Sequence, residues 1–201
     1  MKNKILLSLI TIFLLITVLV IHENSLVMRF DALIANLIGM VQSPFLDRFA
    51  LSFTKIGDAY ESLYIFIIFG LFLIAQKKKY AFYTLTLATG FGIIFTQSMK
   101  LLVERARPIS NMLVETTFSF PSGHAAISTI FLLGSVLLVA PLIKNIFIRD
   151  VFVFATFILF PFVAISRLYL SVHFASDVIA GILLGYMCFM LAQMMIKRSD
   201  L

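Results

Sequence analysis

Six long runs of apolar residues follow one another along the 201-residue chain, separated by short polar stretches. An α-helix needs about 20 apolar residues to cross the roughly 30 Å of hydrocarbon in a bilayer, and each run is close to that length. A membrane β-barrel would instead alternate apolar and polar positions in segments of about ten residues. The pattern predicts an all-α, polytopic membrane protein with transmembrane helices at residues 5–21, 59–76, 80–102, 125–143, 151–170 and 178–196.

The first run and the segment after it need separate interpretations. The run at 5–21 follows two lysines, as in a signal peptide, but no pair of small residues suited to cleavage follows it, so we expect a retained helix. The spacing within residues 22–58 predicts two short amphipathic helices at 26–41 and 45–56, which lie on the outer leaflet or cover the bundle. No repeat or second domain is evident, so we expect residues 1–201 to form a single integral-membrane domain.

Composition excludes the common alternatives to a membrane protein. Hydrophobic residues make up 61% of the chain and charged residues 13%. Soluble domains have about 45–50% hydrophobic residues and about 25% charged residues. A soluble globular domain is therefore excluded, and so is a disordered chain, which needs low hydrophobicity and high charge. The single cysteine, Cys188, excludes an intramolecular disulfide and a multi-cysteine metal site.

The basic residues indicate how the helices are oriented. Cytoplasmic loops are enriched in lysine and arginine, and three consecutive lysines directly after the second predicted span mark that side. Both termini are then cytoplasmic, and most of the net charge of +6 is explained without a nucleic-acid partner. The cytoplasmic side carries Lys2, Lys4, Lys77, Lys78, Lys79, Lys144, Arg149, Lys197 and Arg198, and the outside carries Arg29, Arg48, Lys55, Lys100, Arg105, Arg107 and Arg167.

Ionisable side chains gather at one end of the predicted bundle. Such residues are costly at membrane depth and are functional candidates by default. The predicted topology brings the ends of the third and fifth spans and the starts of the fourth and sixth to the same outer face. The residues concerned are Lys100, Glu104, Arg105, Arg107, Ser122, His124, Ser166, Arg167, His173 and Asp177. Within this group we interpret Glu104 and Arg105 as a local pair or as rim residues.

Three cations in this group favour a phosphate ligand. Lys100, Arg107 and Arg167 are too many for one carboxylate, and they suit a group with two or three negative charges. Ser122 and Gly123 stand at a predicted helix start, where free backbone N–H groups and the helix dipole bind phosphate. Ser122 could equally be an ordinary helix cap with nothing bound.

Two histidines and an aspartate are candidate catalytic groups. His173 and Asp177 are four residues apart, so on a helix they would share a face, and the carboxylate would keep one imidazole nitrogen protonated while the other attacks. His124 could serve as general acid or base. Asp177 could instead be an acid favoured by a helix dipole. The three side chains could also bind a metal, but the cations would repel it and the further carboxylates are lacking, so we predict no metal.

The polar segments together resemble a known family. Lys100-x6-Arg107-Pro108, Pro121-Ser122-Gly123-His124 and Ser166-Arg167-x5-His173-x3-Asp177 are similar to the three-part signature of the type 2 phosphatidic acid phosphatase family. The resemblance covers residues 100–177 directly, and the six-span layout extends it over nearly the whole chain.

The resemblance implies a role for each signature residue. His173 would attack phosphorus and form a phosphohistidine, and Asp177 would orient it. His124 would protonate the leaving oxygen and then activate water. The phosphoryl oxygens would be held by Lys100, Arg107, Ser122, Gly123 and Arg167.

The position of the site indicates the substrate class. A site at the outer surface of the membrane suits a lipid with a phosphate or pyrophosphate head group, and bacterial family members of similar size act on undecaprenyl pyrophosphate, phosphatidylglycerophosphate or phosphatidic acid. We expect no cofactor and no obligate protein partner. A lipid phosphotransferase using the same phosphohistidine is an alternative. A haloperoxidase is disfavoured by the membrane embedding, and a small anion transporter by charges that lie at one face instead of at mid-membrane.

Overall fold

The computed structural model describes residues 2–196 and shows a bundle of helices. Within this range the elements are α-helices joined by short 3-10 or π-helical segments and by one long loop, at residues 104–122. The helices are α1 Lys2–Ile21, α2 Ser25–Gly39, α3 Pro44–Thr54, α4 Ala59–Ala75, α5 Lys79–Val103, α6 Gly123–Gly134, α7 Ile146–Tyr169 and α8 Ala175–Met195, with short segments at Lys55–Gly57, Ser135–Val139 and Ala140–Leu142.

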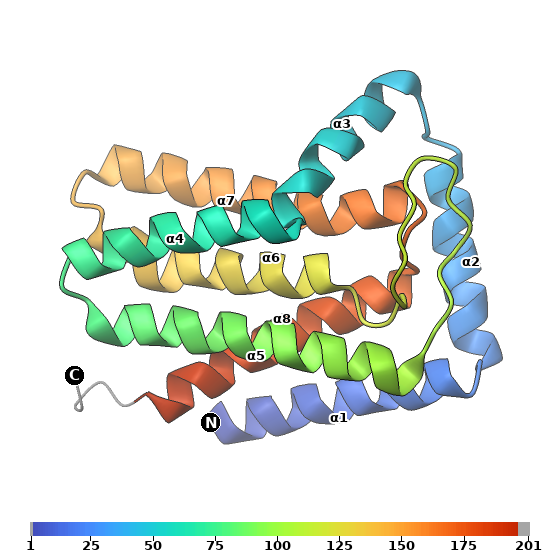
Figure 1. The fold of residues 1–201 in the computed structure, drawn as a ribbon, viewed down its shortest axis with the longest axis horizontal. Helices are drawn as coiled ribbons and strands as arrows, with labels where there is room; N and C mark the ends of the chain where they lie inside the picture. Colours follow the sequence, from blue (N-terminus) through green and yellow to red (C-terminus); the bar gives the residue numbers. More distant parts are fainter. Residues whose placement is uncertain (1, 197–201) are drawn as a thin grey trace.

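Most helices run along a common direction, and α2 lies across one end of them (Figure 1). The 104–122 loop and the connection from α7 to α8 are at this same end, whereas the turns that join α4 to α5 and α6 to α7 are at the other end (Figure 1). Helix α8 packs against α6, α5 and α1. The bundle therefore has one end with long connections that can form a site, and one end with tight turns.

Two glycines of α8 allow α6 to approach it closely. A Cβ atom at Gly181 would lie 2.3 Å from the backbone oxygen of Ser122, and one at Gly185 would lie 2.3 Å from that of Ala126. Only a residue without a side chain fits these positions, because real side chains do not tolerate such distances. The contact fixes the start of α6 beside the start of α8, where two of the predicted motifs lie.

The predicted membrane spans are confirmed, with a qualification for the second. Within residues 2–196, five helical stretches are long and apolar enough to cross a membrane, and a sixth is obtained if Pro44–Gly57 and Ala59–Ala75 are counted as one bent span. The two parts of this span meet at 57°. Helix α4 alone has 17 residues, which at 1.5 Å per residue is about 26 Å and falls short of the hydrocarbon thickness.

The two amphipathic helices are confirmed with nearly the predicted bounds. Each begins at a polar cap, since the side chain of Asn24 accepts from the N–H of Leu26, and that of Ser43 from the N–H of Leu46. Helix α3 packs against α7. Helix α2 directs Asp31 inward, and this aspartate is almost fully buried, whereas its outer side exposes Leu26, Phe30, Leu33 and Leu37.

Candidate active site

The predicted site residues converge at the end of the bundle that α2 crosses. They come from the last turn of α5, the 104–122 loop, the start of α6, the last turn of α7, and the turn that leads into α8. A cavity of about 600 Å³ is lined by Lys100, Arg107, Gly123, His124 and His173. Ser122, Arg167 and Asp177 are fully buried directly behind these residues. All eight predicted site residues are thus brought together.

His173 lies in the turn before α8, not on the helix. The four-residue spacing to Asp177 suggested two side chains on one helical face, but α8 begins at Ala175 and Asp177 belongs to its first turn. The two side chains still meet, with Nδ1 of His173 3.5 Å from Oδ2 of Asp177. The imidazole is therefore held by the turn and its neighbours, and not by a helix of its own.

The hydrogen bonds around His173 define its tautomer. Nη1 of Arg107 lies 3.1 Å from Nε2 of His173. Because a guanidinium has donors only, Nε2 must be the accepting nitrogen, so the ring proton is on Nδ1 and faces Asp177. Burial, the largest effect, lowers the pKa of His173 to about 4, with Arg107 and Arg167 acting in the same direction against Asp177. The imidazole is therefore neutral at ordinary pH, with its Nε2 lone pair directed at the cation cluster.

Within the described residues, two groups besides His173 hold the carboxylate of Asp177. Its Oδ2 accepts from the backbone N–H of Phe174 at 2.9 Å, which caps the start of α8. Its Oδ1 accepts from Nη1 of Arg105 at 2.5 Å. The same Nη1 also donates to the hydroxyl of Ser176. These bonds satisfy a carboxylate that is fully buried, as a buried charge requires.

The interpretation of Glu104 and Arg105 as a local pair is wrong. Helix α5 ends at Glu104, whose left-handed backbone (φ 50°) turns the chain into the loop and leaves its side chain exposed. Arg105 turns inward, where only 9% of its side chain is exposed. It pairs with Asp177 and with Asp31 of α2, and its guanidinium lies 4.1 Å from the centre of the Phe174 ring. Arg105 is thus a buried connection between three elements.

The three predicted phosphate-binding cations are held mainly by backbone and hydroxyl oxygens. Nζ of Lys100 donates to the hydroxyl of Thr117 at 3.0 Å and to the carbonyl of Phe118 at 2.8 Å. Nε of Arg107 donates to the carbonyl of Thr117 at 2.6 Å. Nη1 of Arg167 donates to the hydroxyl of Thr54 at 2.6 Å. These neutral oxygens fix the side chains without cancelling their charge.

Glu115 in the 104–122 loop is a site residue that sequence reasoning missed. Its carboxylate accepts a hydrogen bond from Nη2 of Arg167 and lies 3.7 Å from Nη2 of Arg107. Burial alone would raise the pKa of Glu115, but the charges of Arg167 and Arg107 outweigh it and lower the pKa. The carboxylate therefore occupies an anion position between two arginines. The sequence did single out Glu115 in one way, because it is the only acidic residue between Glu104 and Asp150.

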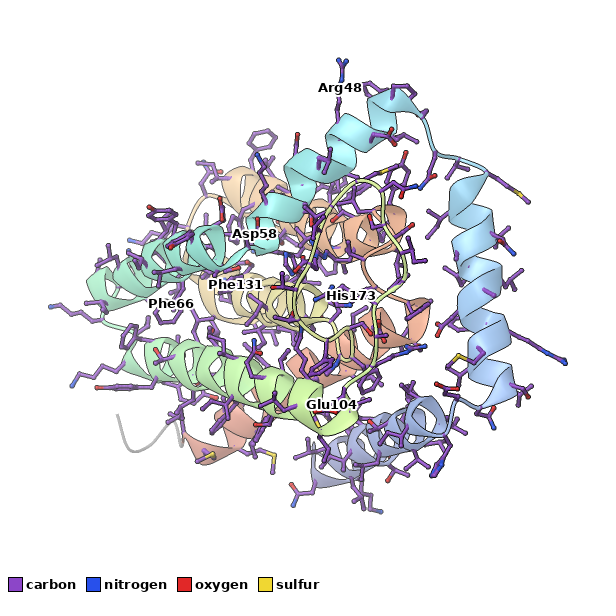
Figure 2. The ribbon with its side chains drawn as sticks, turned by 45° about the vertical axis from the view of Figure 1, so that its right-hand side comes forward. Arg48, Asp58, Phe66, Glu104, Phe131 and His173 are labelled. Carbon is purple, nitrogen blue, oxygen red and sulfur yellow. The ribbon has the colours of Figure 1, made fainter. Side chains whose placement is uncertain are left out.

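Asp58 is the second missed residue. Its Oδ1 lies 2.9 Å from Nε2 of His124. The adjoining Gly57 packs against the same ring, since a Cβ atom there would lie 2.4 Å from Cδ2 of His124. The bend before α4 thus packs against the ring and bonds one of its nitrogens, and Figure 2 labels Asp58 at this bend. An ionised carboxylate can only accept, so Nε2 of His124 carries the proton.

The cavity continues from the charged groups between α4 and α5. Its further lining includes Leu63 and Phe66 of α4 and Ile93 of α5; Phe66 is labelled in Figure 2. Leu63 and Ile93 are each 52% exposed, so the cavity reaches the lateral surface of the bundle. Its walls can accommodate a polar head at one end and an apolar chain at the other.

That the site works without a metal ion remains a prediction. In the described part of the chain, residues 2–196, no three side chains of histidine, cysteine, aspartate or glutamate are placed to hold an ion together. Each histidine of the site instead faces one carboxylate, at 2.9 Å for His124 and 3.5 Å for His173.

Comparisons with known proteins agree with this geometry. A family model described as the PAP2 superfamily matches residues 79–200. The chain is 30% identical over 193 residues to phosphatidylglycerophosphatase B of Bacillus subtilis (strain 168), and the match covers 90% of each protein. The crystal structure of a transmembrane PAP2 type phosphatidylglycerolphosphate phosphatase from Bacillus subtilis superposes with a TM-score of 0.83 at 26% identity, over 96% of this chain and 98% of that one.

A second solved structure supports the fold alone. LpxE of Aquifex aeolicus has a TM-score of 0.56 at 24% identity, covering 84% of this chain and 94% of that one. The family model covers more than half of the chain, including all three motifs, and the fold, spans and site geometry are consistent with it. The chain therefore belongs to the PAP2 superfamily and is a membrane-embedded lipid phosphatase.

Proposed function

We propose that the protein hydrolyses phosphatidylglycerophosphate, undecaprenyl pyrophosphate or both at the extracytoplasmic face of the cell membrane. The observation that carries the proposal is the single cavity that joins the histidine and cation cluster to an apolar opening between α4 and α5. A phosphate head would bind at the first end while its hydrocarbon chain stays in the bilayer. The name of the Bacillus subtilis relative favours phosphatidylglycerophosphate.

The charges at the two ends of the bundle support an outward-facing site. Lys77, Lys78 and Lys79 are at the turn between α4 and α5, which is opposite to the end crossed by α2 (Figure 1). Lysine-rich turns stay in the cytoplasm. Both termini would then be cytoplasmic, and residues 1–201 would act as a single integral-membrane domain.

The first chemical step would use the free lone pair of His173. Arg107 and Arg167 would bind the phosphoryl oxygens, which releases Nε2 of His173 from Arg107 and leaves it directed at phosphorus. Nε2 would form a bond to phosphorus while the bond from phosphorus to the leaving oxygen breaks. Lys100 and the helix start at Ser122 and Gly123 would stabilise the charge that develops on the phosphoryl group.

The proton for the leaving oxygen would come from His124. Asp58 favours the doubly protonated imidazole by its negative charge at Nε2, and Nδ1 has no hydrogen-bond partner in residues 2–196. After losing a proton to the leaving oxygen, His124 would take one from water. The resulting hydroxide would break the bond between nitrogen and phosphorus, releasing phosphate and restoring His173.

Phosphate release from defined lipids tests the proposal. The purified full chain in detergent would be given phosphatidylglycerophosphate, undecaprenyl pyrophosphate and phosphatidic acid side by side, with and without excess chelator. His173→Ala is the test variant, and His22→Ala is its matched control because His22 is exposed after α1.

We expect release that is lost in His173→Ala, retained in His22→Ala and unaffected by chelator. Release that persists in His173→Ala would refute the mechanism. A folded protein that releases no phosphate from any lipid would refute hydrolysis and favour transfer of the phosphoryl group to another acceptor.

A further inference from the structure

Arg105 does not line the cavity, unlike Arg107. It lies behind Asp177, between α2 and α8, with Nη2 2.7 Å from Oδ2 of Asp31 and Nη1 2.5 Å from Oδ1 of Asp177. Both carboxylates are at least 97% buried. Asp31 also accepts from the N–H and the hydroxyl of Ser176. The proposed reaction uses neither Arg105 nor Asp31.

The network ends at the proposed nucleophile. Arg105 contacts Asp177 directly, and Asp177 faces the protonated nitrogen of His173. A carboxylate shared with a guanidinium carries less free charge than an unpaired one, so Arg105 limits how strongly Asp177 can attract a proton to His173. The guanidinium donates through Nη1 to Asp177 and through Nη2 to Asp31, so its planar fork ties the two carboxylates together.

We infer that Arg105, anchored by Asp31 on α2, is a positioning residue that sets the orientation and the proton affinity of His173 through Asp177. The inference rests on the proposed role of His173 as nucleophile. It makes α2 part of the catalytic apparatus, although this helix carries no residue that lines the cavity. Because the outer side of α2 exposes apolar residues, we expect the helix to be seated in the lipid interface, which holds Asp31 against Arg105.

The other charges around His173 set the background against which Arg105 acts. Asp177 of α8, Arg107 of the loop and Arg167 of α7 act on His173. Asp177 also interacts with Lys100 of α5 and with Arg107. Removing Arg105 takes away the cation nearest to Asp177 and leaves all of these groups in place, so the change can be assigned to the network.

The chain is suited to a direct measurement, because it has only three histidines. Histidine labelled with ¹⁵N in the full chain, in detergent micelles, reports the tautomer and titration midpoint of each ring, and His173→Gln assigns the signal of His173. The test variant is Arg105→Met combined with Asp31→Asn, which removes opposite charges together. Arg48→Met is the matched control, since Arg48 points away from the bundle (Figure 2).

In the double variant we expect the His173 midpoint to rise by about one pH unit and kcat to fall about tenfold, with KM little changed. Arg105→Lys keeps the positive charge but loses the planar guanidinium, so the His173 midpoint should rise by less. This variant serves as the test if the double variant does not fold. Arg48→Met should change neither quantity.

An unchanged His173 midpoint in folded variants, or a loss of activity that lies wholly in KM, would overturn the inference. Failure of the proposed function would appear separately, as phosphate release that persists in His173→Ala. The NMR titration does not depend on that result.

Discussion

The two histidines of the site each face a carboxylate, but in opposite surroundings. Asp177, beside His173, is fully buried and is fixed by Arg105 and the backbone. Asp58, beside His124, has 47% of its side chain exposed and lies at the bend before α4. A nucleophile needs a fixed, neutral ring, whereas an acid and base must exchange protons with water in each turnover. The buried pair therefore suits the attack on phosphorus, and the pair with the exposed carboxylate suits the proton transfers of a two-step reaction.

The largest effect should come from removing the buried histidine. His173→Ala eliminates the atom that bonds to phosphorus, so we expect the turnover of every lipid phosphate to fall by about 10⁴-fold or more. Phosphate release under saturating substrate checks this. Glutamine in place of His173 should be equally inactive, because no amide nitrogen can replace the lone pair of Nε2.

Removing His124, the histidine that faces the exposed Asp58, should cost less, and the cost should depend on the leaving group. His124→Ala should lower turnover by about 10²- to 10⁴-fold for a phosphate monoester. For a diphosphate the loss should be smaller, because the leaving phosphate needs less help from a proton. A comparison of kcat for phosphatidylglycerophosphate and undecaprenyl pyrophosphate measures the ratio. Equal losses for both substrates would mean that His124 does not protonate the leaving group.

The next effect concerns the carboxylate at the bend. Asp58→Asn keeps the size of the side chain but removes its charge, so we expect turnover to fall by about 10- to 100-fold. The alkaline limb of the pH–rate profile should move to lower pH, because the protonated form of His124 loses its stabilising neighbour. Asp150→Asn is a suitable control, since Asp150 pairs only with exposed Arg149 within the described residues. An unshifted profile would indicate that the charge of Asp58 does not act on His124.

The smallest effect should come from the carboxylate that occupies the anion position. A substrate phosphate must displace Glu115 from Arg167 and Arg107 before it binds. Glu115→Gln should therefore lower the inhibition constant of inorganic phosphate by about fivefold, as expected for one partly exposed ion pair. Inhibition assays at constant ionic strength measure it. An inhibition constant that rises would show that Glu115 helps to hold phosphate.

The helices and the signature residues could be predicted from sequence because their signals are local. Hydropathy identifies a span within about 20 residues, and each motif lies within one short segment, so the cations and histidines converge as the topology predicts. The bend before α4 is an exception. Its two helices are each short, and only the fold shows that they meet at 57°.

The partners of the site residues could not be predicted, because they come from distant parts of the chain. Asp58 is 66 residues from His124, Glu115 is 52 residues from Arg167, and Asp31 is 74 residues from Arg105. Nothing in the local pattern distinguishes these acids from ordinary helix caps or loop residues. Arg105 was misinterpreted for the same reason. Its neighbour Glu104 suggested a nearby partner, but the left-handed turn at the end of α5 leaves the side chain of Glu104 exposed.

The most direct test of the different roles of the two histidines is to find where the phosphoryl group is bound. Undecaprenyl pyrophosphate labelled with ³²P would be mixed with the wild-type chain, His124→Ala and His173→Ala, quenched in alkali to preserve phosphohistidine, and mapped by peptide mass spectrometry. We predict label on His173, most in His124→Ala because water is no longer activated, and none in His173→Ala. Label on His124, or turnover of His124→Ala without any labelled histidine, would contradict the account.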